Sequence, residues 1–186
     1  VAVEQQCICR YCVRALAQAA ANGDQSAVRN YAPDRHVVVT HLKLDVTPDF
    51  ESRTVSGTAT IHFRPIARPL ESLQLDGVHL DVSDVRSSAP IADYAVDEKH
   101  VALVFATPIE VDADAHVEID YAAEPVKGLY FRTPEMGFAE TDAHVWTQGE
   151  PHEARHWYPC FDYPNERSTT EVICHVPPKM TVLSNG

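Results

Sequence analysis

The stretch VVVTHLKLDV, residues 37–46, alternates side chains with a period close to two. A second stretch, TVSGTATIHF at residues 54–63, repeats the alternation after a short polar connection. Because successive side chains of an extended chain point to opposite faces, this period is typical of a β-strand with one buried face. Further short strand-like runs follow at residues 73–75, 78–85, 101–105, 117–121, 129–131, 144–147, 170–176 and 181–183.

Turn residues separate these runs, for example Asp76-Gly77 and Pro177-Pro178. Many short strands at this spacing favour an all-β fold over alternating strands and helices. We therefore expect an antiparallel β-sandwich or an open saddle.

Two segments depart from the β pattern. Residues 3–22 predict a helix, because apolar side chains recur there at spacings of four, three and four. Those side chains are Cys9, Val13, Leu16 and Ala20. Residues 150–157 predict a second, short helix, since Pro151 suits the first helical position and Pro159 lacks the donor needed to continue.

Length and composition limit the classes of protein that fit. With 186 residues and 45% hydrophobic residues, the chain suits one domain with an appendage. We expect a helical extension over residues 1–30 and a β-rich domain over residues 31–186. The formal net charge of −12 argues against a nucleic-acid partner, which needs clustered cations to neutralise phosphates. No apolar run approaches the roughly 20 residues of a membrane span.

The five cysteines do not form a disulfide framework for a chain of this size. A reducing compartment, and hence the cytoplasm, is the expected location. Cys160 and Cys174 lie in apolar runs and are interpreted as small core residues. Cys7, Cys9 and Cys12 either lie on a helix face or contribute to a metal site whose further ligands the sequence does not reveal.

The string HEARH contains a potential zinc motif. In such a motif His152 and His156 would be zinc ligands one helical turn apart, with Glu153 as general base. The helix predicted there is short, and no third ligand follows at a known spacing, which argues against a zinc site. A self-contained zinc hydrolase that uses His152, Glu153 and His156 is kept as an alternative.

A longer pattern surrounds this motif: TQGEPHEAR at residues 147–155 and YPCFDYP at residues 158–164. It closely resembles the end of the N-terminal domain of the aminopeptidase N family of zinc metallopeptidases, the gluzincins. Gly128-Leu129-Tyr130 resembles another strand of that domain. The resemblance covers residues 35–186.

The resemblance implies a substrate-cleft domain of an enzyme that removes N-terminal residues from peptides. Gln148 and Glu150 match family positions that line the cleft, where the acidic residue grips the free α-ammonium group. The family's zinc is bound in a following catalytic domain, which we expect this chain to lack. No zinc and no activity are therefore expected of the chain alone. Its expected partners are a peptide N-terminus and the remaining domains of the same polypeptide.

Two alternatives stay open. Some members of the family have lost catalysis and kept the β domain as a scaffold. Glu150 could also simply cap the helix predicted to begin at Pro151.

Arg155 and Asp162 are interpreted as structural residues. A planar guanidinium could form a bidentate pair with the carboxylate of Asp162 and so fix the turn after the predicted helix.

Overall fold

The computed structural model of the chain describes residues 35–184. The helix predicted at residues 3–22, the extension expected over residues 1–30 and the three clustered cysteines lie outside the described residues.

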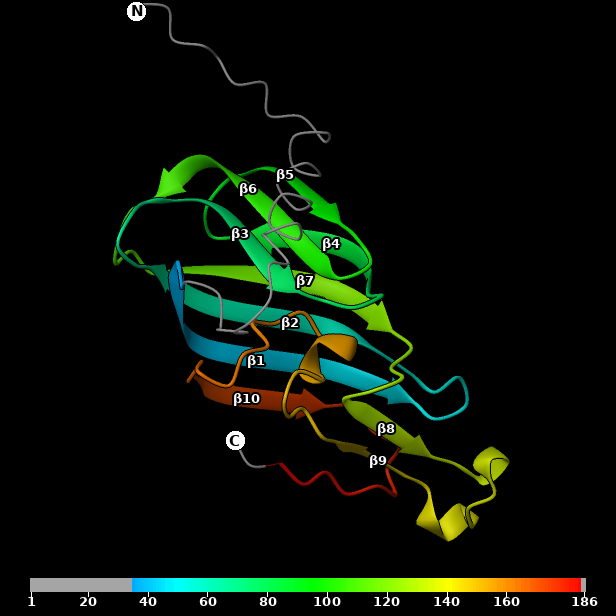
Figure 1. Cartoon of the computed structure of the whole chain (residues 1–186). Coiled ribbons are helices and arrows are strands. Elements are labelled where there is room, and N and C mark those ends of the chain that lie inside the picture. The colour runs from blue at the N-terminus through cyan, green and yellow to red at the C-terminus, as the bar shows by residue number, and fades with distance from the viewer. Residues whose placement is uncertain (1–34, 185–186) are drawn as a thin grey trace, which may run out of the picture.

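Three sheets make up the described part of the chain (Figure 1). The largest has the spatial order β10 (Thr169–Cys174), β1 (Val37–Asp49), β2 (Thr54–Pro65), β7 (Ala115–Ala123) and β4 (Asp81–Ser87). The second has the order β3 (Leu70–Asp76), β6 (His100–Ile109) and β5 (Ile91–Val96). The third pairs β8 (Leu129–Arg132) with β9 (His144–Thr147), and the 3-10 turns are η1 (Pro134–Met136), η2 (Glu140–Asp142) and η3 (Ala154–His156).

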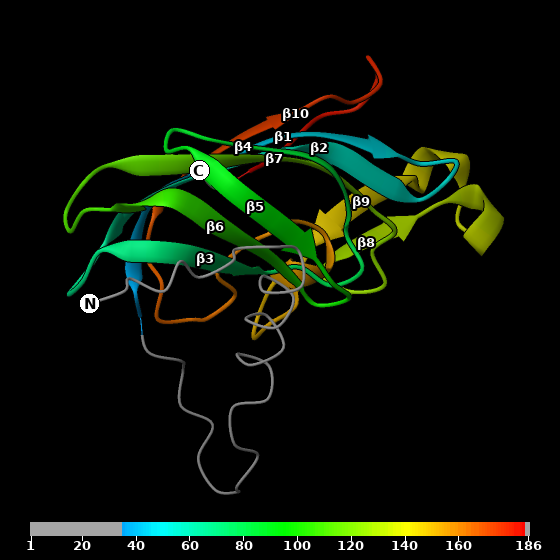
Figure 2. The same ribbon diagram turned by 90° about the horizontal axis from the view of Figure 1, so that it is seen from above.

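The two larger sheets pack as separate layers around one apolar core (Figure 2). Ile61 and Phe63 of β2 share this core with Leu75 of β3 and Leu103 of β6. All four side chains are almost completely buried, and each such burial is worth about 1.5–3 kcal/mol. The predicted all-β fold of packed, open sheets is confirmed.

The alternation in the opening stretch changes phase once, and the structure shows why. Val37 and Val39 are buried, whereas Leu44 and Val46 are the buried residues further along the same strand. The register of β1 against β2 shifts between Val39 and His41. An extra residue at this bulge moves the buried positions from odd to even numbers and keeps both halves of the strand on the core.

The opposite face of the five-stranded sheet is polar. In β7 the odd-numbered residues from Ala115 to Ala123 are buried, while His116, Glu118 and Asp120 between them are partly exposed. Antiparallel sheets commonly have one face on the core and one in solvent, which is the arrangement here.

Three features differ from the sequence-based expectation. Strand β10 pairs with β1 in parallel, so the large sheet is not purely antiparallel. Strand β5 was not predicted. The run at residues 181–183 is not a strand: it is irregular, and Leu183 is 91% exposed. Apolar residues alone did not make this run a strand, because it has no neighbouring strand in the described structure to hydrogen-bond with.

Among residues 35–184, no helix has the length and apolar character needed to cross a membrane.

Gly57 allows β1 and β2 to approach closely. A Cβ atom at this position would lie 2.1 Å from the carbonyl oxygen of Asp45 and 2.8 Å from the Cα of Val46. Gly57→Ala must therefore push the two strands apart. We expect it to lower the free energy of unfolding by about 1–3 kcal/mol, measured by urea denaturation.

Gly149→Ala is the matched control, because its added Cβ would meet only ordinary contacts, the nearest at 3.6 Å from the Cβ of Ala154. It should change stability by no more than about 0.5 kcal/mol. Equal stability of the two variants would contradict the close approach at Gly57.

Candidate functional site

The segment after β9 is a tight turn rather than the short α-helix predicted over residues 150–157. The N–H of Glu153 donates to the carbonyl of Gly149 at 2.8 Å, and only Ala154–His156 forms a 3-10 turn. The prediction of a helix beginning at Pro151 is therefore wrong. The peptide bond between Glu150 and Pro151 is cis.

The backbone of Arg155 explains this difference. Its N–H donates to the carboxylate of Asp162 at 3.1 Å instead of to a carbonyl four residues earlier. Its carbonyl accepts from the N–H of Val78 at 2.8 Å, because Pro159, four residues later, has no N–H to offer. Tertiary partners thus replace the hydrogen bonds that an α-helix would need.

The guanidinium of Arg155 joins two acidic residues. Its Nε donates to Oδ2 of Asp162 at 2.9 Å, and its Nη2 donates to the Asp162 carbonyl at 3.1 Å. Its Nη1 lies 3.0 Å from Oδ1 of Asp76. The predicted pairing of Arg155 with Asp162 is confirmed. The guanidinium does not bind the Asp162 carboxylate through two nitrogens, because its other nitrogens contact the Asp162 carbonyl and the Asp76 carboxylate.

Asp76 was interpreted from sequence only as a turn residue, and it proves central to this turn. It ends β3, and its backbone exchanges two hydrogen bonds with Cys160, at 2.8 and 3.0 Å. Its Oδ2 also accepts from the N–H of Asp162 at 3.1 Å. No local pattern could have revealed this contact, because the two aspartates are 86 positions apart.

Burial shifts the pKa of two groups in this cluster. It raises the pKa of Asp76, against the opposing effects of the Asp162 N–H and of the Arg155 charge. Burial also raises the pKa of the Cys160 thiol, and the charges of Asp162 and Asp76 add to the shift. A thiol in this state is a poor nucleophile. Cys160 is therefore the small core residue that was predicted, and Cys174 packs half-buried against the same core.

The histidines of the HEARH string do not form a zinc site. The ring of His152 contacts the ring of Tyr163, with 5.5 Å between centres, whereas His156 Nε2 lies 3.8 Å from Oε2 of Glu153. Oε1 of Glu153 accepts from the ammonium of Lys127 at 3.2 Å. Within residues 35–184 no three His, Cys, Asp or Glu side chains are arranged to hold a metal ion.

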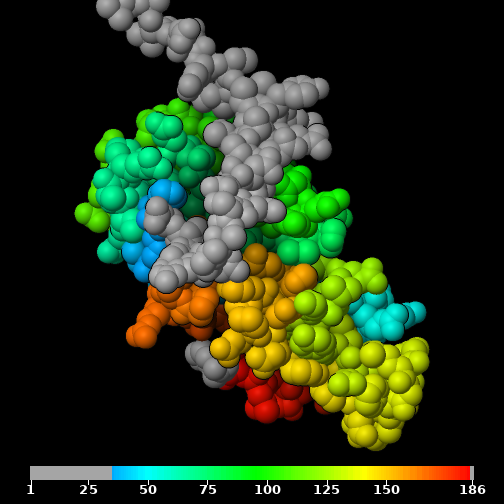
Figure 3. All heavy atoms as spheres, viewed as in Figure 1, coloured from blue at the N-terminus to red at the C-terminus, as the bar shows by residue number. Residues whose placement is uncertain are grey.

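Gln148 and Glu150 lie together on the surface, directly before this turn. The N–H of Gln148 donates to the carbonyl of Gly128 at 2.9 Å, which extends the pairing of β8 and β9 by one residue. Both side chains are exposed. Since no helix begins at Pro151, Glu150 has no helix to cap. The region around β8 and β9, drawn in yellow-green and yellow, protrudes at one end of the molecule (Figure 3).

An aromatic pair beside Gln148 was not predicted. Tyr130 of β8 and Trp146 of β9 are register partners, and their rings stack with 4.7 Å between centres. Trp146 remains 41% exposed. Trp146 lies two residues before Gln148 in the sequence. The TQGEP string itself gave no signal for this pair.

Gly128 couples the strands to the turn. It has a positive φ of 75°, and a Cβ there would lie 1.9 Å from the carbonyl oxygen of Glu153. Only glycine fits this approach without displacing the turn. The strand that supports Gln148 is thereby packed directly against the turn that follows Glu150.

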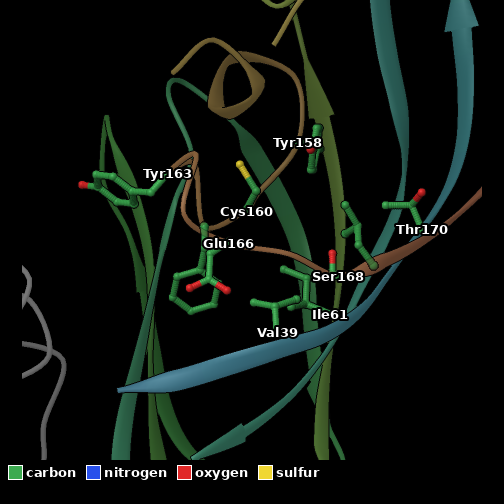
Figure 4. Close-up of a pocket in the computed structure, with 10 residues that line it drawn as sticks. Val39, Ile61, Tyr158, Cys160, Tyr163, Glu166, Ser168 and Thr170 are labelled. Carbon is green, nitrogen blue, oxygen red and sulfur yellow. The ribbon is translucent and has the colours of Figure 1, made fainter. Parts of the chain in front are cut away.

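A separate cavity of about 180 Å³ lies behind the turn (Figure 4). Tyr158, Cys160 and Tyr163 line it from the turn side, and Val39 and Ile61 from the large sheet. Gln148 and Glu150 are not among its lining residues, so the cavity and the predicted substrate-binding residues are different places.

Comparison with known proteins points to one family. The model of the Peptidase M1 N-terminal domain matches residues 38–186. Aminopeptidase 2, mitochondrial, of Saccharomyces cerevisiae is 28% identical over 166 residues, which cover 84% of this chain and 17% of the yeast protein. Endoplasmic reticulum aminopeptidase 1 of Mus musculus is 27% identical over 180 residues, which cover 89% of this chain and 19% of the mouse protein. The chain thus spans about a fifth of the length of these relatives.

Solved structures show the same fold. An M1 zinc metallopeptidase from Deinococcus radiodurans matches 78% of this chain and 34% of its own, with a TM-score of 0.62 and 21% identity. Native leukotriene A4 hydrolase from Saccharomyces cerevisiae matches 84% of this chain and 26% of its own, with a TM-score of 0.63 and 22% identity.

Removal of the Arg155 guanidinium should leave two largely buried carboxylates without their cation. We expect Arg155→Leu to lower the free energy of unfolding by about 3 kcal/mol, because removing one partner of a buried ion pair leaves the other charge uncompensated. Thermal and urea unfolding measure the change.

Arg86→Leu is the control. Arg86 also pairs with carboxylates, those of Glu118 and Asp120, but its side chain is 44% exposed. Exposed pairs contribute only about 0–1 kcal/mol. An Arg155→Leu variant as stable as Arg86→Leu would show that the buried pairs do not hold the turn.

Proposed function

This chain belongs to the Peptidase M1 N-terminal domain family, and on that premise we propose that it forms one wall of the substrate cleft of a zinc aminopeptidase. In this proposal Glu150 and Gln148 hold the free amino terminus of a peptide. The relatives named aminopeptidases support the activity, and the exposed pair on a fixed turn supports the role of these two residues.

The observation that carries the proposal is an exposed carboxylate on a rigid base. The turn after Glu150 is tied to Asp162 and Asp76 through Arg155. The strand before it is paired up to Gln148. A backbone that is fixed in this way loses little conformational freedom when a ligand binds, which favours affinity and precise placement.

The chemistry of the pair suits an α-ammonium group. The Glu150 carboxylate can accept charge-assisted hydrogen bonds from the amine. The Gln148 side chain can accept from the amine through its oxygen and donate to a peptide carbonyl through its nitrogen. An anchored amine fixes the distance to the first peptide bond, which limits cleavage to one residue at a time.

The zinc of such an enzyme does not fit the residues described here, because His152 and His156 do not converge. We therefore assign zinc binding and bond cleavage to another domain of the intact polypeptide. The contribution of this chain is to bind and orient the substrate, and the chain alone should not hydrolyse peptides.

Glu150→Ala in the intact enzyme should sharply lower kcat/KM for peptides with a free amino terminus. The loss of a charge-assisted contact to an ammonium corresponds to about 2–3 kcal/mol, or roughly 30- to 150-fold. Glu150→Gln should be intermediate, since it keeps the hydrogen-bond acceptor and loses the charge. Steady-state kinetics with an aminoacyl reporter substrate measures these effects.

Glu124→Ala removes another exposed glutamate and is the control, with unchanged kinetics expected. An unchanged kcat/KM for Glu150→Ala would refute the assigned role. An intact protein without any peptidase activity would instead favour a scaffold function for the family member.

A further inference from the structure

An exposed aromatic stack lies on the pair of strands that leads to Gln148 (Figure 1). Tyr130 of β8 and Trp146 of β9 are register partners, and their rings stack with 4.7 Å between centres and an angle of 23° between planes. Trp146 is 41% exposed in spite of this contact. Contiguous exposed apolar surface of this kind is typical of a binding site.

The stack lies outside the apolar core. The other face of β8 provides the packing: Leu129 and Phe131 are buried members of the core, and the Phe131 ring contacts that of Phe50, with 5.6 Å between centres. Because successive residues of a strand point to opposite faces, Tyr130 lies on the face away from these contacts. Trp146, its stacking partner, does not belong to the core either. The fold therefore leaves the stack available to a ligand.

The stack is also close to the residues proposed to hold the substrate amine. Two residues of chain span at most about 7 Å between Cα atoms, which limits the separation of Trp146 and Gln148. The backbone of Gln148 is held in the same ladder by its hydrogen bond of 2.9 Å to the carbonyl of Gly128. An amine held by Gln148 and Glu150 belongs to a carbon that also carries the first side chain of the peptide. That side chain therefore starts within reach of the indole.

We propose that the Tyr130–Trp146 stack binds the side chain of the first residue of the peptide and favours aromatic and large aliphatic residues there. The inference rests on the proposed function, because it takes Gln148 and Glu150 as the amine-binding pair. An aromatic side chain gains most, since it can stack on the indole in addition to burying apolar surface. The methyl group of alanine covers little of the indole and gains little.

The test is steady-state kinetics of the intact enzyme with phenylalanyl, leucyl and alanyl reporter substrates. Trp146→Ala should lower kcat/KM at least about fivefold for the phenylalanyl and leucyl substrates, and by less than about twofold for the alanyl substrate. The ratio of the phenylalanyl to the alanyl value should therefore fall. Trp146→Phe keeps an aromatic ring and should restore most of this ratio.

Phe138→Ala is the matched control. Phe138 lies in the loop between β8 and β9 and is 36% exposed, close to the value for Trp146. Its ring centre lies 4.8 Å from the guanidinium carbon of Arg132, which pairs with His144 at the end of the ladder away from Gln148. The substitution should leave the ratio unchanged. Melting temperatures of the intact variants confirm that each one folds.

The same substrates distinguish a failure of the stack from a failure of the amine clamp. Glu150→Ala should lower kcat/KM by a similar factor for all three substrates, because all three carry the same amine. An unchanged ratio in Trp146→Ala would overturn the role of the stack alone. An equal loss for all three substrates in Trp146→Ala would also overturn it and would indicate that another domain covers the indole. An intact protein that cleaves none of the three would overturn both proposals.

Discussion

The guanidinium of Arg155 joins parts of the chain that are far apart in sequence. It contacts Asp162, seven residues later, and Asp76, at the end of β3 in the smaller sheet. Its backbone is engaged as well, with Asp162 on one side and Val78 on the other. Because these groups are largely buried, each charge depends on the others for compensation. The turn can therefore adopt only the conformation in which all of these contacts form together.

This constraint determines what the turn displays. The residues that hold it, Arg155 and Asp162, are turned inward, while Gln148 and Glu150 just before them remain exposed. Gly128, just before β8, packs closely against the carbonyl of Glu153 in the turn. These two exposed side chains thus lie next to a network of buried hydrogen bonds. Such support suits the positioning of a substrate amine that we propose for them.

In the large sheet, the alternation of side chains along each strand determines which residues are exposed. It buries one face of β2 and β7 and leaves the other face polar. Register then decides which polar residues become neighbours, and it places His41, His62 and His116 in one row. These side chains are partly exposed and lie outside the apolar core.

The sequence by itself determined the all-β fold, because the period of two in residues 37–46 and 54–63 is a direct consequence of strand geometry. It also determined the family, through the string from Thr147 to Pro164, and the partnership of Arg155 with Asp162, which are close along the chain. Only the tertiary structure decided the role of Asp76, the parallel pairing of β10 and the row of histidines, because these depend on contacts between residues far apart in sequence. It also replaced the predicted helix with a turn, since buried partners of Arg155 outcompeted the local hydrogen bonds that a helix would have used.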